Sequence, residues 1–360
     1  YEVEAAGLID GGADLLIIET QLDLHGLKAA VNGARRAKRS SGRDVPLHTQ
    51  VTIELTGRML PGTEIGAALA AMEALGPDVL GLNCATGPLE MYEPVRYLSA
   101  HSSTPISIIP NAGLPSVVGG AMHYDLDASD MAHHLRTFVD EFGVNVVGGC
   151  CGSTPEYIGT LIEALADVTP RVREPQRIPA VTSTYSPVSL HQDTSFLIIG
   201  ERTNANGSRA FRDAMLEGDI DACIAIGEGQ VAEGAHLVDL CVDYVGRDGA
   251  EDIGPIAARF ATEITAPVVI DSTEPPVMQA ALERIGGRCV LNSANLEDGE
   301  AEGSRLDRVL SLAKEHGAAV ICLLIDVRGQ ARDLEGTMEV AHRLHDSATT
   351  RYGLEPEDLI

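Results

Sequence analysis

Short apolar runs alternate with segments in which apolar residues recur at helical spacing along most of the chain. Continuous apolar runs are typical of parallel strands buried on both faces, and the segments between them of amphipathic helices. The first half carries five predicted strands, at residues 14–20, 47–53, 78–82, 106–109 and 144–147. The second half carries five more, at residues 196–200, 237–242, 268–270, 290–291 and 319–325.

Predicted helices separate these strands. The clearest of them span residues 24–39, 91–99, 128–142, 209–217, 221–233, 255–264, 276–285 and 304–316. Repeated strand-helix units indicate (β/α) barrels, whose functional residues follow the strands. The predicted fold is α/β, with two (β/α)8 TIM-type barrels in tandem. Because each barrel needs eight strands, both are expected to be incomplete in this chain, with units missing before Tyr1 and after Ile360.

A proline-rich segment divides the two halves. Residues 168–193 contain Pro170, Pro175, Pro179 and Pro187 among polar residues, a density that disfavours helix and central strand. The predicted domains are therefore a first barrel at 1–167, a linker at 168–193 and a second barrel at 194–360.

Composition narrows the possible partners. The 360 residues have a net charge of −27, which argues against nucleic acid and anionic membranes, since both need a basic face. The longest apolar run, residues 318–325, suits a buried strand and is too short to span a membrane. Seven cysteines, mostly in apolar strands, and the absence of a leader at Tyr1 predict reduced thiols in the cytoplasm.

Three cysteines directly follow predicted strands. Cys84 follows the third, and Cys150 and Cys151 follow the fifth within Gly-Gly-Cys-Cys-Gly. A vicinal pair by itself is more often buried or a redox pair. Here the glycines are predicted to let the backbone leave strand geometry, so that both sulfur atoms can approach one ion together with Cys84. Three thiolates leave the fourth position of zinc open, as in catalytic sites.

Polar residues also end the strands of the second half. A single polar residue at a strand end is as often a helix cap or a loop anchor as a ligand-binding residue. A series of carboxylates and amides at the ends of successive strands instead predicts a binding site. Such a site suits a ligand whose edge carries adjacent hydrogen-bond donors and one acceptor, such as a pterin. The residues in question are Asn204, Asp239, Asp271, Asn292 and Asp326.

With these motifs in view, the first half resembles the homocysteine methyltransferases. The resemblance rests on Asn-Cys-Ala-Thr-Gly-Pro at residues 83–88 and Gly-Gly-Cys-Cys-Gly-Ser-Thr-Pro at residues 148–155. Cys84 and Cys150 lie 66 residues apart, close to the interval of that family.

This resemblance implies a catalytic zinc site that takes the homocysteine sulfur as its fourth ligand. The implied zinc ligands are Cys84, Cys150 and Cys151. It also assigns Glu19 to the amino group of homocysteine and suggests that Asn83 and Asn111 shape the same pocket. The alternative role of the two asparagines is to cap turns and strand ends.

The second half resembles the pterin-binding methyltransferases and dihydropteroate synthases, most closely the folate module of cobalamin-dependent methionine synthases. The resemblance is carried by Ile-Gly-Glu-Arg-Thr-Asn at residues 199–204, by Asp239, by Ile-Asp-Ser at 270–272 and by Leu-Asn-Ser-Ala-Asn at 291–295. It implies that the pterin is bound by Asn204, Asp239, Asp271 and Asn292. One departure is Cys241, which stands where that family usually has the asparagine of Asp-x-Asn.

Together the resemblances cover nearly the whole chain, in the module order of cobalamin-dependent methionine synthases. They imply methyl transfer from 5-methyltetrahydrofolate to homocysteine through cobalamin, giving methionine and tetrahydrofolate. Cobalamin-binding and S-adenosylmethionine-binding activation modules would lie outside these 360 residues. One alternative is a cobalamin-free homocysteine S-methyltransferase that uses a sulfonium or betaine donor. Another is a corrinoid- or folate-binding module with a structural zinc.

Overall fold

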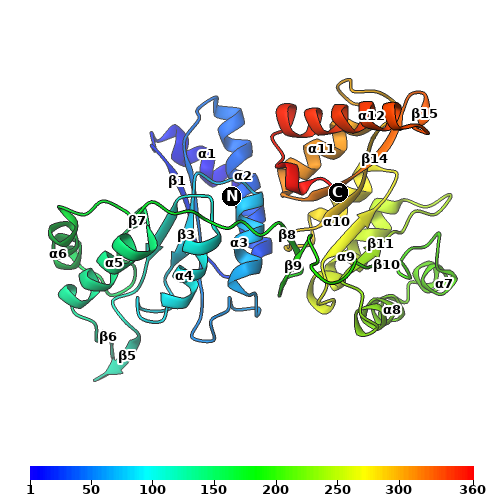
Figure 1. Ribbon diagram of the computed structural model, residues 1–360. Coiled ribbons are helices and arrows are strands. Elements are labelled where there is room, and N and C mark those ends of the chain that lie inside the picture. Colours follow the sequence, from blue (N-terminus) through cyan, green and yellow to red (C-terminus); the bar gives the residue numbers. More distant parts are fainter. The chain divides into compact units, whose positions relative to one another are not determined.

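The structure, a computed structural model, describes residues 1–360 and divides into two compact units, Tyr1–Ile178 and Pro179–Ile360. Each unit is built on one parallel sheet flanked by helices (Figure 1). The boundary between the units falls inside the predicted linker segment, residues 168–193. No helix combines the length and the apolar character that crossing a bilayer would require.

The sheet of the first unit has five parallel strands in the order β1-β2-β3-β4-β7. They are β1 (Leu16–Gln21), β2 (Leu47–Val51), β3 (Val79–Asn83), β4 (Ile106–Ile109) and β7 (Val146–Val147). All five predicted strands are confirmed. Because strands that follow one another along the chain also pair side by side, the unit is a partial (β/α) barrel, as predicted.

Helices of the first unit pack their apolar faces on this sheet. They are α1 (Glu2–Asp10), α2 (Leu24–Ser41), α3 (Ile65–Ala74), α4 (Tyr92–His101), α5 (Ala128–Phe142) and α6 (Pro155–Leu165). The sequence sets the ends of α2, where Asp23 accepts a hydrogen bond from the Gly26 N–H and Gly42 adopts the left-handed conformation. Leu27 and Val31 of this helix are fully buried in the core of the unit.

A hairpin that was not predicted projects from the first unit between β4 and α5 (Figure 1). It consists of β5 (Pro115–Val118) and β6 (Ala121–Tyr124), which pair antiparallel. Gly119 and Gly120 both have positive φ and form its two-residue turn. Two glycines between short extended runs are a hairpin signal that sequence reasoning could have used.

The second unit has the sheet order β10-β11-β12-β13-β14-β15. Its strands are β10 (Ile199–Gly200), β11 (Leu237–Leu240), β12 (Val268–Asp271), β13 (Val290–Leu296), β14 (Ala319–Asp326) and β15 (Gly329–Gln330). The first five are parallel and match the five predicted strands, whereas β15 pairs antiparallel with β14. This unit is therefore a second partial (β/α) barrel.

Six α-helices accompany the second sheet. They are α7 (Arg209–Glu217), α8 (Ile220–Ala232), α9 (Gly249–Glu263), α10 (Pro275–Leu282), α11 (Arg305–His316) and α12 (Leu334–Asp346). The predicted start of α9 at Pro255 is wrong. The helix begins at Gly249 because Asp248 accepts hydrogen bonds from the N–H groups of Ala250 and Glu251, so Pro255 lies inside it.

Part of the predicted linker forms structure of its own. A hairpin of β8 (Ala180–Thr182) and β9 (Pro187–Ser189) belongs to the second unit. Its Val181 packs in a small buried cluster with residues at the N-terminal part of four strands, namely Leu237, Val269, Val290 and Ala319. The hairpin therefore covers the end of the second sheet opposite to the strand ends that carry the polar residues.

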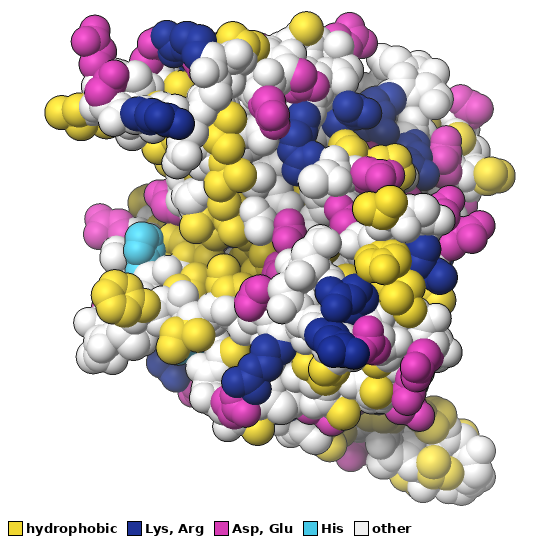
Figure 2. Space-filling model, turned by 90° about the vertical axis from the view of Figure 1, so that its right-hand side faces the viewer, with side chains coloured by type: hydrophobic (Ala, Val, Ile, Leu, Met, Phe, Trp, Pro, Cys, Tyr) yellow, Lys and Arg dark blue, Asp and Glu magenta, His cyan; other side chains and the backbone are white.

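Each parallel sheet has an unpaired edge, and large apolar side chains are exposed there. Ile17 of edge strand β1 is 50% exposed, and Ile199 of edge strand β10 is 37% exposed. Figure 2 shows hydrophobic side chains gathered in a hollow on one face of the molecule. Because a closed barrel has no edge, this exposure follows from the open form of both sheets.

Candidate functional site

Three cysteine sulfur atoms converge in the first unit. The Cys84 Sγ lies 3.8 Å from the Cys151 Sγ, which lies 4.0 Å from the Cys150 Sγ. All three sulfur atoms lie within 4.8 Å of one another, so each could bind the same ion. Cys84 and Cys150 are half-buried and Cys151 is exposed, which leaves one side of the cluster accessible. Three sulfur ligands with one open side fit a zinc site with a free coordination position.

An unusual backbone conformation places Cys84. Cys84 and Ala85 both have φ of 58°, in the left-handed region that few residues other than glycine adopt. The turn is held because the Cys84 N–H donates to the Ile109 carbonyl oxygen (3.1 Å) and the Thr86 N–H donates to the Cys84 carbonyl oxygen (2.7 Å). Strain of this kind clusters at functional sites, which is consistent with a role for Cys84.

The vicinal cysteines sit on a turn after β7. The Cys150 N–H donates to the Pro110 carbonyl oxygen at 2.8 Å, and Gly152 has φ of 82°. Strand β7 ends at Val147, so Gly148 and Gly149 lie outside it, and of the three glycines only Gly152 has positive φ. Gly149 is instead required by space, since a Cβ there would lie 2.4 Å from the Ser153 Oγ.

Electrostatics favour a cation at this cluster. Burial, followed by the charge of Cys84, raises the pKa of the Cys150 thiol to about 12. Three neighbouring thiolates therefore cannot coexist at neutral pH unless a positive charge lies among them. A divalent ion bound here would supply that charge and would deprotonate its thiol ligands.

Glu19, Thr20 and Asn83 form a hydrogen-bonded group beside the thiols. The Asn83 Nδ2 donates to the Glu19 Oε2 (2.9 Å) and to the Thr20 Oγ1 (2.8 Å), and the Thr20 N–H donates to the Asn83 Oδ1 (2.8 Å). Thr20, which sequence reasoning missed, has φ of 54° at the bulge where β1 ends. The same Asn83 Nδ2 lies 4.0 Å from the Cys150 Sγ, so the Glu19 carboxylate is held near the cluster.

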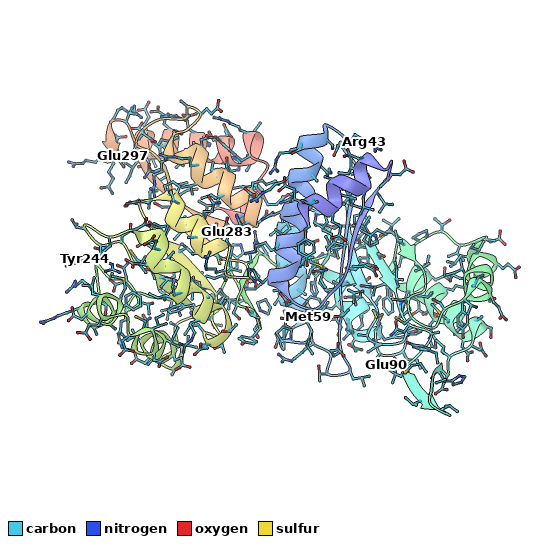
Figure 3. All side chains as sticks on the ribbon, turned by 180° about the vertical axis from the view of Figure 1, so that it is seen from behind. Arg43, Met59, Glu90, Tyr244, Glu283 and Glu297 are labelled. Carbon is cyan, nitrogen blue, oxygen red and sulfur yellow. The ribbon has the colours of Figure 1, made fainter.

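Asn111 and Glu90 hold the loops around the cluster. The buried Asn111 accepts a hydrogen bond from the Cys151 N–H at its Oδ1 (3.1 Å) and therefore fixes the Cys151 peptide. The Glu90 Oε2 accepts from the Gly87 N–H (3.1 Å), and Gly87 packs on Gly113. Glu90 consequently lies beside the base of the β5–β6 hairpin (Figure 3).

In the second unit, Asn204 joins two of the predicted carboxylates. Its Nδ2 donates to the Asp239 Oδ2 (2.8 Å) and to the Asp271 Oδ2 (2.9 Å). Its Oδ1 accepts from the N–H groups of Asn206 (2.9 Å) and Gly207 (3.3 Å). Because both hydrogens of this amide are engaged, Asn204 orients the two carboxylates before any ligand arrives.

Asp239 is a buried acid with one unsatisfied oxygen. Its Oδ1 is buried and has no hydrogen-bond partner. Burial is the main reason that the pKa of Asp239 is raised to about 7, and the neighbouring charges of Asp271 and Glu201 add to it. The pKa of Asp271 is also raised by burial. Asp239 is therefore partly protonated at neutral pH.

We expect the Asp239→Asn variant to remove a pH dependence of folding stability. Because the folded-state pKa is raised from 3.8 to about 7, the stability that Asp239 contributes is complete below pH 4 and is lost as the pH rises through 7. Between pH 5 and pH 7 the wild type should lose about 2 kcal/mol relative to the variant. Urea unfolding of both proteins across this range measures the difference. Parallel stability profiles would show that Asp239 is ionised throughout.

Asp271 and Asn292 end strands β12 and β13, and two residues missed by sequence reasoning fix the loops that follow. Asp243 accepts hydrogen bonds from the Ser272 Oγ and the Thr273 N–H, both at 2.8 Å. The guanidinium of Arg305 donates to the carbonyl oxygens of residues in both loops, namely Ser272 (3.0 Å), Thr273 (2.6 Å) and Ser293 (3.1 Å). Asp243 directly follows the predicted strand at 237–242, a signal that sequence reasoning could have used, whereas Arg305 lies on α11 and only the folded structure reveals its contribution.

Cys241 is buried beside this group. Its sulfur accepts a hydrogen bond from the Asn206 Nδ2 at 3.7 Å. The Cys241 carbonyl oxygen also accepts from the Ala205 N–H at 2.9 Å. Cys241 thus supports the loop that carries Asn204.

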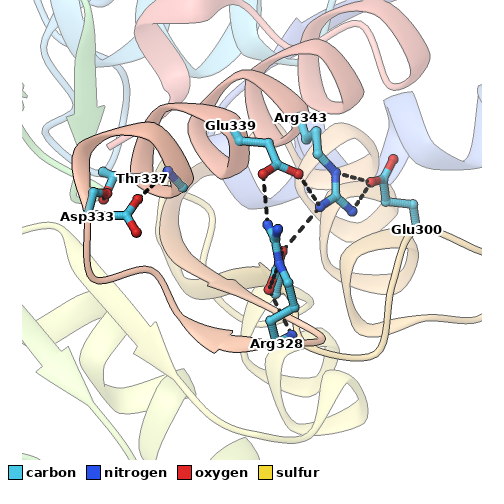
Figure 4. A network of polar contacts seen from close by, with 8 residues as sticks. Glu300, Arg328, Asp333, Thr337, Glu339 and Arg343 are labelled. Atoms are coloured by element: carbon cyan, nitrogen blue, oxygen red, sulfur yellow. Dashed lines mark hydrogen bonds and ion pairs between the residues drawn. The ribbon is translucent and has the colours of Figure 1, made fainter.

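Asp326, the last polar residue of the predicted series, belongs to an ion-pair network (Figure 4). Its Oδ2 lies 2.7 Å from the Arg328 Nη2 and 3.4 Å from the Arg343 Nη1. These arginines also pair with Glu339 (2.9 Å) and Glu300 (2.5 Å), respectively. Hydrogen bonds from Arg328 lower the pKa of Asp326. Asp326 therefore has a structural role and is not available to a pterin in the way that Asp271 is.

Comparison with known proteins assigns a family to each unit. Residues 1–165 match the homocysteine S-methyltransferase family, and residues 200–360 match the pterin-binding enzyme family. The two matches divide the chain as its two partial barrels do, with one family to each barrel.

Two curated relatives contain both modules in this order. This chain is 49% identical to the methionine synthase of Mycobacterium tuberculosis over 360 residues and 49% identical to that of Mycobacterium leprae over 365 residues. The chain therefore belongs to the methionine synthase family, of which it comprises the homocysteine and pterin-binding modules. All of this chain aligns in both cases, and it spans 30% of the length of each relative.

Among solved structures, the chain is similar to a dihydropteroate synthase of Xanthomonas albilineans in complex with 7,8-dihydropteroate. It aligns with 50% of this chain and 62% of its own, at 18% sequence identity and a TM-score of 0.36.

Proposed function

We propose that this chain carries the homocysteine and folate sites of an enzyme that transfers the methyl group of 5-methyltetrahydrofolate to homocysteine. The products are methionine and tetrahydrofolate, and cobalamin carries the methyl group between the two sites. The observation that carries this proposal is the convergence of Cys84, Cys150 and Cys151 in a unit of the homocysteine S-methyltransferase family. That unit is joined to a pterin-binding one in the order found in methionine synthases.

In the first unit the three cysteines would hold zinc and leave its fourth position for the substrate sulfur. Zinc, when bound, is a Lewis acid that keeps a thiol ionised at neutral pH, which matters because the thiolate is the nucleophile. The Glu19 carboxylate, oriented by Asn83, would bind the amino group of homocysteine. Asn111 would keep Cys151 in position through its peptide N–H.

In the second unit the pterin would meet Asp271 and Asn292 at adjacent strand ends. Asp271 and Asn292 are direct neighbours in the register of β12 and β13. Asn204 engages only the Oδ2 of Asp271, so the other oxygen can accept from the amino group of a pterin. Asp239 would act through Asn204, since it orients the same amide.

Cobalamin and its carrier modules belong to the proposal as partners outside these 360 residues. The cobalamin-binding module and an S-adenosylmethionine-binding activation module would act on this chain in the longer protein. A cobalamin-free homocysteine S-methyltransferase with a sulfonium or betaine donor would leave the second unit without a ligand. The match of residues 200–360 to a pterin-binding family argues against this alternative. A structural zinc would need a fourth protein ligand, and the cluster contains three.

Binding measurements on paired variants test the two sites separately. We expect Asp271→Ala and Asn292→Ala each to weaken binding of 5-methyltetrahydrofolate by about 1–3 kcal/mol, because a buried polar partner is lost. Zinc-dependent binding of homocysteine should be unchanged in both. Cys151→Ser should show the opposite pattern. Isothermal titration calorimetry with each ligand measures both affinities in all three variants.

The exposed pair of Asp213 and Arg209 provides a matched control, in which Asp213→Ala should alter neither affinity. Equal folate affinity in the wild type and in both folded site variants would contradict the pterin site. Loss of folate binding in Cys151→Ser would contradict the division of ligands between the two units.

A further inference from the structure

The regular pairing of strands β12 and β13 ends at the two residues that would bind the pterin. Asp271 lies opposite Asn292 as the last pair in their register, and the Ser272 N–H donates to the Asn292 carbonyl oxygen (3.3 Å). Directly after Asn292, the register of β13 against β14 shifts. The carbonyl groups of Ser272 and Ser293 therefore lie beyond the regular ladder, and backbone groups that leave a ladder need other partners.

A single arginine side chain supplies those partners. The Nη2 of Arg305 donates to the Ser272 carbonyl oxygen (3.0 Å), its Nη1 to that of Thr273 (2.6 Å) and its Nε to that of Ser293 (3.1 Å). The first two acceptors follow Asp271 in the chain, and the third follows Asn292. Because a guanidinium presents its N–H groups as a rigid planar fork, Arg305 fixes the two loops relative to each other.

The loop after β12 is also held by a carboxylate. Asp243, from the loop after β11, accepts hydrogen bonds from the Ser272 Oγ and the Thr273 N–H, both at 2.8 Å. Ser272 and Thr273 thus donate to Asp243 and accept from Arg305. Three consecutive strand ends, those of β11, β12 and β13, are linked in this way.

The stability of α11 does not account for an arginine at its start. Arg305 is the first residue of the helix, directly after the N-cap Ser304. A positive charge in the first turn of a helix is unfavourable, because it meets the positive end of the helix dipole. The half-buried Arg305 side chain is explained instead by its three carbonyl acceptors in the strand-end loops.

We propose that Arg305 is a positioning residue of the pterin site. Its three hydrogen bonds tie the loop after Asp271 to the loop after Asn292, and they hold the carboxylate and the amide at the spacing that the edge of a pterin needs. Groups that are fixed before a ligand arrives bind it more tightly, because less freedom is lost on binding. Arg305 acts through Asp271 and Asn292 and does not touch the ligand in this role. This inference rests on the pterin site of the proposed function.

The Arg305→Met variant tests this role, because it keeps an unbranched side chain and removes all three hydrogen bonds. We expect the affinity for 5-methyltetrahydrofolate to fall about 10-fold in isothermal titration calorimetry. In the Asn292→Ala background the same change should cost about 2-fold, because one of the two groups that Arg305 positions is already absent. A lower stability alone would reduce the affinity by the same factor in both backgrounds. Urea unfolding gives the folded fraction of each protein.

Arg308→Met is the matched control, because Arg308 is exposed on the same helix, and it should leave the folate affinity unchanged. Arg305→Lys is a milder second variant that keeps the positive charge. It should also lose affinity, because an ammonium group does not present a planar fork to three acceptors.

Wild-type folate affinity in either Arg305 variant would overturn the role of Arg305. Equal losses for Arg305→Met in the two backgrounds would overturn it as well. A wild-type chain that binds no 5-methyltetrahydrofolate would instead overturn the pterin site itself, and the two failures are therefore distinguishable.

Discussion

Replacing Cys84, Cys150 or Cys151 by serine is expected to abolish stoichiometric zinc binding, whereas the wild-type chain should hold one equivalent. Each cysteine supplies one of three sulfur atoms that lie within 4.8 Å of one another. A serine hydroxyl is not ionised at neutral pH and cannot replace a thiolate. The loss of zinc affinity should exceed the roughly 10–100-fold loss that follows when a group supporting the ligands, and not a ligand itself, is removed. Elemental analysis after dialysis against a weak chelator measures it.

Cys223→Ser and Cys289→Ser are the matched controls for this experiment. Both cysteines are buried in the core of the second unit, whereas the cluster belongs to the first unit. Their variants should lose some stability and keep the zinc. Stoichiometric zinc in all three variants of the cluster would contradict the site.

Removing the carboxylate of Asp358 is expected to destabilise the second unit by about 3–5 kcal/mol, because it leaves a buried arginine without its counter-charge. The Asp358 Oδ1 lies 2.7 Å from the Arg288 Nη2, and both residues are almost completely buried. Arg288 also donates to the carbonyl oxygens of Ala180 (2.8 Å) and Gly317 (2.9 Å). The pair therefore ties the β8–β9 hairpin to the sheet. Urea unfolding of Asp358→Ala measures the effect.

Two comparisons make this prediction specific. Glu233→Ala breaks the exposed pair of Arg202 and Glu233 and should cost little, because surface ion pairs contribute little. The double variant Arg288→Met, Asp358→Leu replaces the buried pair by apolar residues and should recover most of the loss. If Asp358→Ala costs no more than Glu233→Ala, the carboxylate is not needed to neutralise Arg288.

Much of the fold could be predicted because parallel strands leave a strong local signal. The apolar runs at residues 14–20 and 319–325 became β1 and β14, since a strand covered on both faces needs such a run. The less regular elements were missed because they depend on single residues and not on a periodic pattern. The start of α9 depends on the cap at Asp248, and β5–β6 depends on the conformation of Gly119 and Gly120. Neither leaves a long periodic pattern.

The candidate sites could be predicted as sets of residue types and not as geometries. Cysteines after two strands of one parallel sheet have to lie at the same end of it, and the structure brings these three together. The strand-end acids of the second half likewise include the pair joined by Asn204. Asp326 belongs to the same pattern, yet its carboxylate pairs with Arg328 and Arg343. Which residues of a pattern face a common space depends on their long-range partners.

The sequence by itself therefore determined the class of fold, the two modules and the residues that end their strands. These follow from local periodicity and from motifs of adjacent residues, which are visible in the amino-acid sequence itself. Only the tertiary structure decided that Cys84 adopts a left-handed conformation and that the Asn204 amide donates both of its hydrogen bonds to carboxylates. Each of these depends on contacts between residues far apart in the chain, and no local pattern encodes such contacts.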